Sequence, residues 1–130
     1  LSKYPWLYYW FPLIFIAGVE FYLSSKSTLP RPPFSIPYLD KFEHGTIYAG
    51  MGFFASRAFK SSSLPVLSEI PGICAILFCV FYGFSDEIHQ SFVPNRETDI
   101  VDILADTIGG IIGQWVYSLK IIDRIFNSVI

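Results

Sequence analysis

The sequence predicts an all-α membrane protein, in which one domain over residues 1–130 forms four transmembrane helices in an up-down-up-down bundle. Three observations predict this class. Hydrophobic residues make up 52% of the chain, and the mean hydropathy is +0.46. Both values are high for a soluble domain of this length. Apolar segments long enough for helices also recur between polar loops, at residues 4–23, 41–59, 71–92 and 99–122.

The first segment, YPWLYYWFPLIFIAGVEFYL, has 20 residues. As a helix it would span about 30 Å, the thickness of the hydrocarbon core of a bilayer. A signal peptide is the alternative, but the segment is long, begins with aromatic residues and has no clear cleavage motif. Four prolines follow between Ser24 and Asp40, and they predict an extended, ordered loop because proline fixes the backbone and lacks an amide donor.

The third segment predicts a helix with a short apolar length, and the fourth predicts a helix that packs closely against a neighbour. Only 13 residues of the third segment, residues 72–84, are wholly apolar, which corresponds to about 20 Å of helix. The polar turn at residues 85–91 should therefore lie at the depth of the lipid head groups. In the fourth segment, Gly109 and Gly113 form a GxxxG motif, which is typical of membrane helices that pack closely.

Charges are distributed unequally between the two ends of the predicted bundle. The end with the loops at 24–40 and 93–98 has nine acids against four lysines and arginines, whereas the opposite end has two acids against five. Cytoplasmic loops of membrane proteins are enriched in lysine and arginine. We therefore expect a multi-pass protein of the cell membrane, with both termini in the cytoplasm and the acid-rich end facing outward.

Polar residues at helical spacing form one stripe on each of three predicted helices, and all three stripes lie at the acid-rich end. A charge at the centre of a membrane helix costs about 3 kcal/mol even on lenient scales. The stripes should therefore face one another and form a polar funnel that is open outward. They comprise Lys41, His44 and Tyr48 on the second helix, Asp86, Glu87 and Gln90 on the third, and Asp99, Asp102 and Asp106 on the fourth.

Four of these residues are candidate catalytic groups. His44 can act as a general base or nucleophile near neutral pH, and Asp86, Glu87 and Asp102 can orient it. The same three carboxylates are candidate ligands of a divalent cation, because Mg, Ca and Mn prefer oxygen ligands. A bound cation would also relieve the repulsion between acids in a half-buried site.

Five further residues are candidates for binding a substrate with a phosphate group. Lys41 and Arg96 supply positive charge, and a guanidinium forms paired hydrogen bonds with phosphate. Tyr48, Gln90 and Asp106 complete the predicted substrate-binding set. The expected partners are membrane lipids or lipid-linked cell-wall intermediates, and no nucleic acid is expected. Nothing in the sequence predicts an oligomeric state.

Structural roles are the alternatives for the same residues. The polar stripes can hold helices together without any chemistry, and His44 can be a hydrogen-bonded packing residue. Arg96 can pair with Asp99 or Asp102 to hold its loop, and Glu20 can extend along its helix to the membrane surface. An ion transporter is less consistent with the sequence, because the acids do not continue into the inner half of the helices.

The stretches DKFEHGTIY and GFSDEIHQSFVPNRETDIVDILADTIGGIIG resemble the VanZ-like membrane proteins. The resemblance extends from about Asp40 to Gly113. It includes a lysine and a histidine at the start of the second helix, a DE-x-x-Q motif, a proline–arginine turn, and an aspartate and a glycine on the last helix. Asn95 replaces the usual glycine of the turn but also tolerates a positive φ. Asp106 replaces the usual asparagine and adds a charge.

The resemblance implies a small multi-pass bacterial membrane protein of the cell envelope. The namesake of the family is linked to resistance to teicoplanin, an antibiotic that acts on cell-wall precursors outside the membrane. The family also resembles membrane enzymes that process lipid head groups. We therefore expect a lipid head-group hydrolase or transferase. The alternative is a non-catalytic protein that binds a lipid or an antibiotic, or that acts as a structural accessory subunit.

Overall fold

The computed structural model describes residues 5–26, 39–119, 124–125 and 128, and these residues contain helices but no strand. The predicted all-α class is therefore confirmed. The proline-rich loop falls largely within residues 27–38, and the expected end of the last helix at residue 122 falls within 120–123, so both lie outside the described residues. The helices are α1 (Pro5–Ser25), α2 (Leu39–Lys60), α3 (Pro65–Glu69), α4 (Pro71–Gln90) and α5 (Ile100–Ser118).

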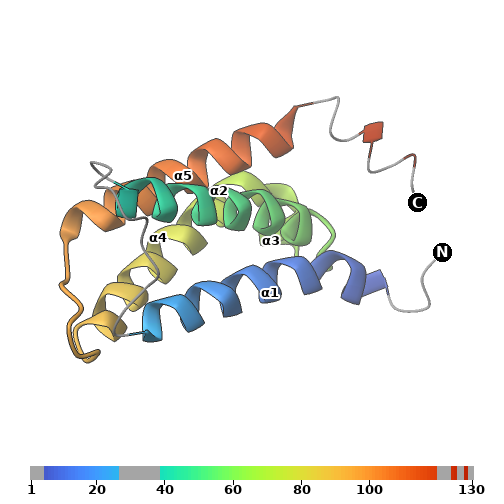
Figure 1. Ribbon diagram of the computed structural model, residues 1–130. Helices are drawn as coiled ribbons and strands as arrows, with labels where there is room; N and C mark the ends of the chain where they lie inside the picture. The colour runs from blue at the N-terminus through green and yellow to red at the C-terminus, as the bar shows by residue number, and fades with distance from the viewer. Residues whose placement is uncertain (1–4, 27–38, 120–123, 126–127, 129–130) are drawn as a thin grey trace.

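The four long helices run alongside one another in alternating directions (Figure 1). The central helix is α2, which contacts α1, α4 and α5, whereas α1 and α5 lie on opposite sides of it. We call the polar end the end of the bundle where α1 and α4 finish and α2 and α5 begin. This alternation brings four helix ends together there, although they are far apart in the sequence.

Three of the helices, α1, α4 and α5, are long and apolar enough to cross a membrane. The sequence predicts four membrane-crossing helices, but α2 is not apolar enough to be a candidate span. Its 22 residues are sufficient in length, but Asp40 and Lys41 near its start and Arg57 and Lys60 near its end lower its mean hydropathy. The structure therefore supports a helical membrane bundle, with three candidate spans among the described residues rather than the predicted four.

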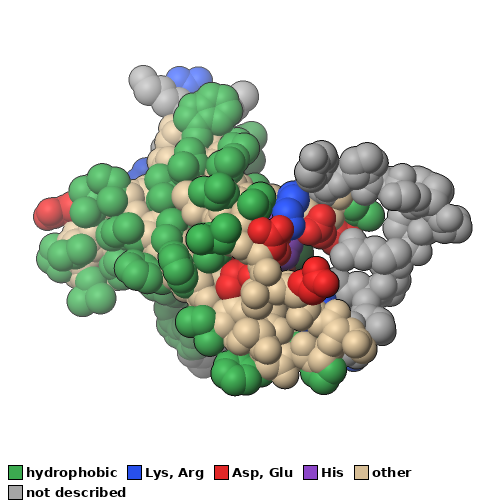
Figure 2. Space-filling model, turned by 90° about the vertical axis from the view of Figure 1, so that its left-hand side faces the viewer, with side chains coloured by type: hydrophobic (Ala, Val, Ile, Leu, Met, Phe, Trp, Pro, Cys, Tyr) green, Lys and Arg blue, Asp and Glu red, His purple; other side chains and the backbone are tan. Residues whose placement is uncertain are grey.

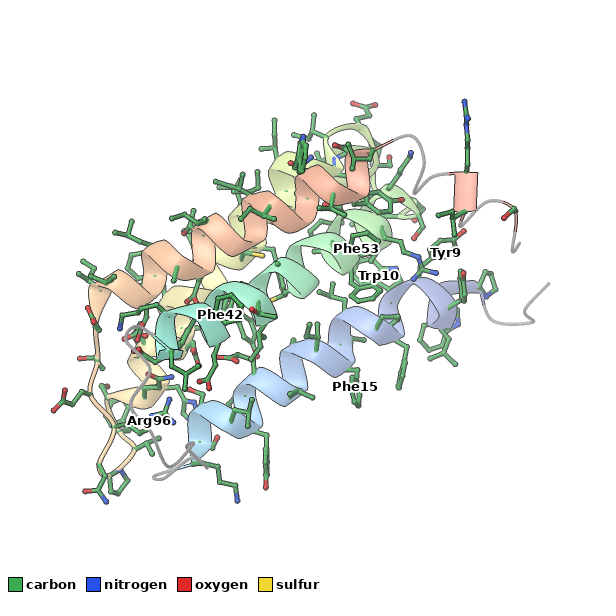
Figure 3. All side chains as sticks on the ribbon, turned by 45° about the horizontal axis from the view of Figure 1, so that its top comes forward. Tyr9, Trp10, Phe15, Phe42, Phe53 and Arg96 are labelled. Carbon is green, nitrogen blue, oxygen red and sulfur yellow. The ribbon has the colours of Figure 1, made fainter. Side chains whose placement is uncertain are left out.

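The sides of the bundle are apolar and much of its interior is polar, which is the reverse of a soluble protein. Among the described residues, ten polar or charged side chains are buried against eight apolar ones. Large apolar residues are exposed instead, including Phe15 at 61% and Phe81 at 69%. Figure 3 shows Phe15 pointing away from the other helices. Such sides fit contact with lipid chains, while the polar groups are kept inside.

Glycines allow α2 and α5 to approach until their backbones touch. A Cβ atom on Gly113 would collide with the carbonyl oxygen of Ala49, and a Cβ atom on Gly109 would collide with the carbonyl oxygen of Gly45. The GxxxG motif of α5 therefore packs against small residues of α2, as such motifs do in membranes. This contact fixes the depth and rotation of the polar residues on both helices.

Local sequence signals explain where the helices begin. The Asp99 side chain accepts a hydrogen bond of 2.9 Å from the backbone amide of Val101 and caps α5, as aspartate does at helix starts. Asn95 has a φ of 64°, so the expectation of a residue that tolerates positive φ in this turn is confirmed. The short helix α3 was not predicted from the sequence, although Pro65 lies in its first turn, a position that proline favours.

Candidate functional site

Charged side chains from four helices meet at the polar end. Figure 2 views this end and shows acidic side chains gathered around a basic side chain and a histidine. We call the following residues the polar cluster: Glu20 from α1; Lys41, His44 and Tyr48 from α2; Asp86, Glu87 and Gln90 from α4; and Asp99, Asp102 and Asp106 from the start of α5. The three predicted polar stripes thus lie at one place in the structure.

His44 is held by a carboxylate on the neighbouring helix. Its Nδ1 atom lies 2.8 Å from Oδ1 of Asp106, whose side chain is fully buried. An Nδ1–H that donates to Asp106 leaves Nε2 as the ring nitrogen that can accept a proton or bind a ligand. Tyr48 stacks on the imidazole, with ring centroids 6.4 Å apart. These contacts fix the orientation of His44, whose Nε2 atom lies 4.0 Å from Oδ2 of Asp102.

Lys41 neutralises the acids at the start of α5. Its Nζ atom lies 2.8 Å from Asp99, 2.7 Å from Asp102 and 2.7 Å from Asp40. The hydrogen bond from Lys41, together with that from the amide of Val101, holds the pKa of Asp99 below its usual range. This network ties the beginnings of α2 and α5 together and leaves Lys41 as a positive charge at the rim of the polar cluster.

Glu20, His44 and Asp86 form a compact group at the centre of the polar cluster. Each offers one atom able to bind a metal ion, and these atoms all lie within 4.8 Å of one another. The exposed fractions of the residues are 4%, 8% and 4%. Three different helices therefore place a mixed nitrogen and oxygen set at one point inside the bundle.

Several buried polar atoms of the polar cluster have no hydrogen-bond partner among the described residues. A buried polar group without a partner costs free energy, on the order of 1–3 kcal/mol each, so such atoms commonly mark sites for ligands or ions. Their concentration at one end of the bundle distinguishes it from ordinary packing. They are Oη of Tyr48, Oδ2 of Asp86, Oε1 of Glu87, Nε2 of Gln90 and Oδ2 of Asp106.

The structure places the residues predicted to bind a substrate in different settings. Lys41, Tyr48, Gln90 and Asp106 all belong to the polar cluster, but Arg96 does not. Figure 3 shows Arg96 beside the end of α1, where its guanidinium donates to backbone carbonyls at 3.4 and 3.1 Å. Its observed contacts are thus with the carbonyls of Leu23 and Lys26 rather than with carboxylates.

The three predicted metal ligands also have different contacts in the structure. Asp86 lies in the central group, but Oε2 of Glu87 accepts a hydrogen bond of 2.9 Å from the amide of Asp99, and Asp102 pairs with Lys41. Glu20 was predicted only to extend to the membrane surface, whereas in the structure it is buried in the polar cluster. Its signal was available, because Glu20 is the one charged residue of α1, and ionisable residues within membrane helices commonly belong to functional sites.

The chain matches a protein-family model over nearly all of its length. The family model VanZ/LLP1 matches residues 6–122, which includes all four long helices and every residue of the polar cluster. No curated protein and no solved structure matches the chain. Since the match covers nearly the whole chain and includes the buried acids and histidine described above, the chain belongs to the VanZ/LLP1 family.

Proposed function

We propose that this chain is a membrane enzyme that acts on the phosphate-bearing head group of a lipid or lipid-linked cell-wall precursor, as a hydrolase or transferase. The observation that supports this most strongly is His44, held through Nδ1 by the buried carboxylate of Asp106 at 2.8 Å. An imidazole oriented in this way can take a proton from an attacking group or bind a cation that activates it. Proton transfer and cation binding would both depend on Nε2 of His44, because Nδ1 is held by Asp106.

The topology that we propose brings the polar cluster to the depth of head groups. In this proposal α2 crosses the membrane as a fourth span, because its contacts with α1, α4 and α5 shield it from lipid. The excess of lysine and arginine at the opposite end of the bundle supports cytoplasmic termini and a polar end that faces outward. A head group of the outer leaflet would then reach the cluster directly.

Lys41 and Gln90 are the residues that we assign to the substrate. The ammonium of Lys41 is 21% exposed at the side chain, so it can contact a phosphate while remaining paired with Asp102. Nε2 of Gln90 is buried without a partner and can donate to a phosphate or hydroxyl oxygen. Arg96 holds the end of α1 and so shapes the entrance rather than the reacting centre.

The test is mass spectrometry of membrane lipids and cell-wall precursors from bacteria with and without the protein. We expect one head-group species to change when the wild-type protein is present. The His44→Gln variant should abolish the change, because glutamine keeps hydrogen-bonding capacity but cannot take up a proton at neutral pH. Glu97→Gln, which alters an exposed loop acid, is the matched control and should behave like the wild type. A folded His44→Gln variant with the full change would contradict catalysis.

The second candidate function is non-catalytic. The chain would bind a lipid or an antibiotic, or act as a structural accessory subunit. This function is favoured by the complete burial of Tyr48 and Asp106, since a fully enclosed group needs a movement before a substrate can reach it. The double variant Glu87→Gln and Asp102→Asn separates the candidates. A binding role should survive it if the shape persists. Teicoplanin susceptibility of the same strains tests the link to resistance that the family resemblance implies.

A further inference from the structure

The central group of Glu20, His44 and Asp86 has the composition of a metal site. One imidazole nitrogen and two carboxylates come from α1, α2 and α4, and their ligand atoms lie within 4.8 Å of one another. Bonds of about 2.0–2.2 Å to one central ion place ligand atoms no more than about 4.4 Å apart, so small side-chain movements are enough to bring these atoms around one ion. The three helices therefore present converging ligands rather than a row of acids on one surface.

Two further observations point to a ligand at this group. Oδ2 of Asp86 is buried and has no hydrogen-bond partner among the described residues, and only 4% of the residue is exposed. Nδ1 of His44 lies 2.8 Å from Oδ1 of Asp106, and metal-binding histidines commonly donate one ring nitrogen to a carboxylate, so we assign Nε2 to the ion. The group thus has a buried carboxylate oxygen without a hydrogen-bond partner, and its histidine is already oriented by Asp106.

The charge of the group also favours a cation. One ligand atom of Glu20 and one of Asp86 lie within 4.8 Å of each other, and two ionised carboxylates at such a distance repel each other. Among the described residues, no lysine or arginine forms an ion pair with either of them, because Lys41 pairs with Asp40, Asp99 and Asp102 instead. A divalent cation would neutralise both carboxylates at once.

We propose that Glu20, His44 and Asp86 bind a divalent cation of the Mn²⁺ or Zn²⁺ kind, with Asp106 orienting His44. Imidazole suits these ions better than Ca²⁺ or Mg²⁺, which prefer sites made of oxygen alone. This inference deepens the proposed function and rests on it in one respect. A cation with three protein ligands keeps an open position, and a phosphate oxygen of the head group would bind there.

The test is binding of Mn²⁺ and Zn²⁺ to the full chain in lipid nanodiscs without added substrate. Elemental analysis gives the stoichiometry, and Mn²⁺ electron paramagnetic resonance gives the affinity. We expect one ion per chain, competition between Mn²⁺ and Zn²⁺, and weak displacement by Ca²⁺. Glu20→Gln and Asp86→Asn should each reduce the affinity at least about tenfold, and Asp106→Asn, which changes only the outer partner, by about 10–100-fold. The exposed control Glu97→Gln should bind like the wild type.

Two results would overturn this proposal. One is a wild-type chain that binds neither ion more tightly than the folded double variant Glu20→Gln and Asp86→Asn. The other is a wild-type site that Ca²⁺ occupies as well as Mn²⁺. Chromatography of each variant establishes that it is folded. The conservative variant Glu20→Asp is a second comparison, because it keeps the carboxylate charge that Glu20→Gln removes. Since no substrate is present, a chain that binds the ion but changes no lipid would contradict the proposed function alone.

Discussion

Replacing Gly113 by leucine is expected to separate α2 from α5 and to destabilise the bundle by about 3 kcal/mol, the upper end of the usual cost of overpacking. The reason is geometric, because even a Cβ atom at this position would collide with the backbone carbonyl of Ala49, and a backbone cannot rotate away as a side chain can. Unfolding of the purified chain in detergent, followed by circular dichroism, measures the effect. A loss of His44-dependent function should accompany it, since the same contact positions the polar cluster.

The matched control for this variant is Gly18→Leu. Gly18 is also a helical glycine, but a Cβ atom there would meet nothing within 4 Å. The change from glycine to leucine should therefore be neutral or slightly stabilising at Gly18, because leucine is the better helix former. Equal stabilities for the Gly113→Leu and Gly18→Leu variants would mean that α2 and α5 do not pack through the GxxxG motif.

Removal of the Lys41 charge is expected to have the second largest effect on stability. Lys41→Met leaves the buried Asp102 with only the longer contact of 4.0 Å to Nε2 of His44, and breaking a buried pair costs about 3–5 kcal/mol. Because the Lys41 side chain is 21% exposed, we expect a smaller loss of about 2 kcal/mol. The double variant Lys41→Met and Asp102→Asn should recover most of the loss, whereas Lys26→Met should lose little because Lys26 is exposed.

The pH dependence of this effect follows from Asp99. Its pKa is lowered in the folded protein, chiefly by the hydrogen bond from Lys41. The stabilisation is therefore complete above the ordinary aspartate pKa of about 4 and disappears as the pH falls through the lower folded value. The stability difference between wild type and Lys41→Met should be largest near neutral pH and should shrink in acid. A difference that grows in acid would contradict the assignment.

The four long helices and the three polar stripes could be predicted from the sequence, because apolar length and helical spacing are local properties. The positive φ at Asn95 could be expected from the family resemblance, because asparagine replaces a glycine there. The stripe on α5 includes Asp99, Asp102 and Asp106, but spacing alone cannot tell which of them meets His44. That depends on how far α2 and α5 slide along each other, which the glycine contacts decide.

Other parts of the site depend on contacts that leave no sequence pattern. The partners of Arg96 are backbone carbonyls of Leu23 and Lys26, and every residue has such a carbonyl. Glu20 is a single acid in an apolar helix, so its position is compatible with a surface location until the packing of α1 against α4 is known. The predicted metal ligands, Asp86, Glu87 and Asp102, therefore come from two helices and do not include the acid of α1.

The central claim is that side chains from separate helices form one coupled, buried centre, and a double-mutant cycle between His44 and Asp106 tests it most directly. Unfolding free energies of His44→Ala, Asp106→Ala and the double variant give the coupling, with His44 and the distant Ser118 as the control pair. We predict a coupling of about 1–3 kcal/mol for His44 with Asp106, as their 2.8 Å contact requires, and none for the control. Additivity within about 0.3 kcal/mol for both pairs would contradict the account.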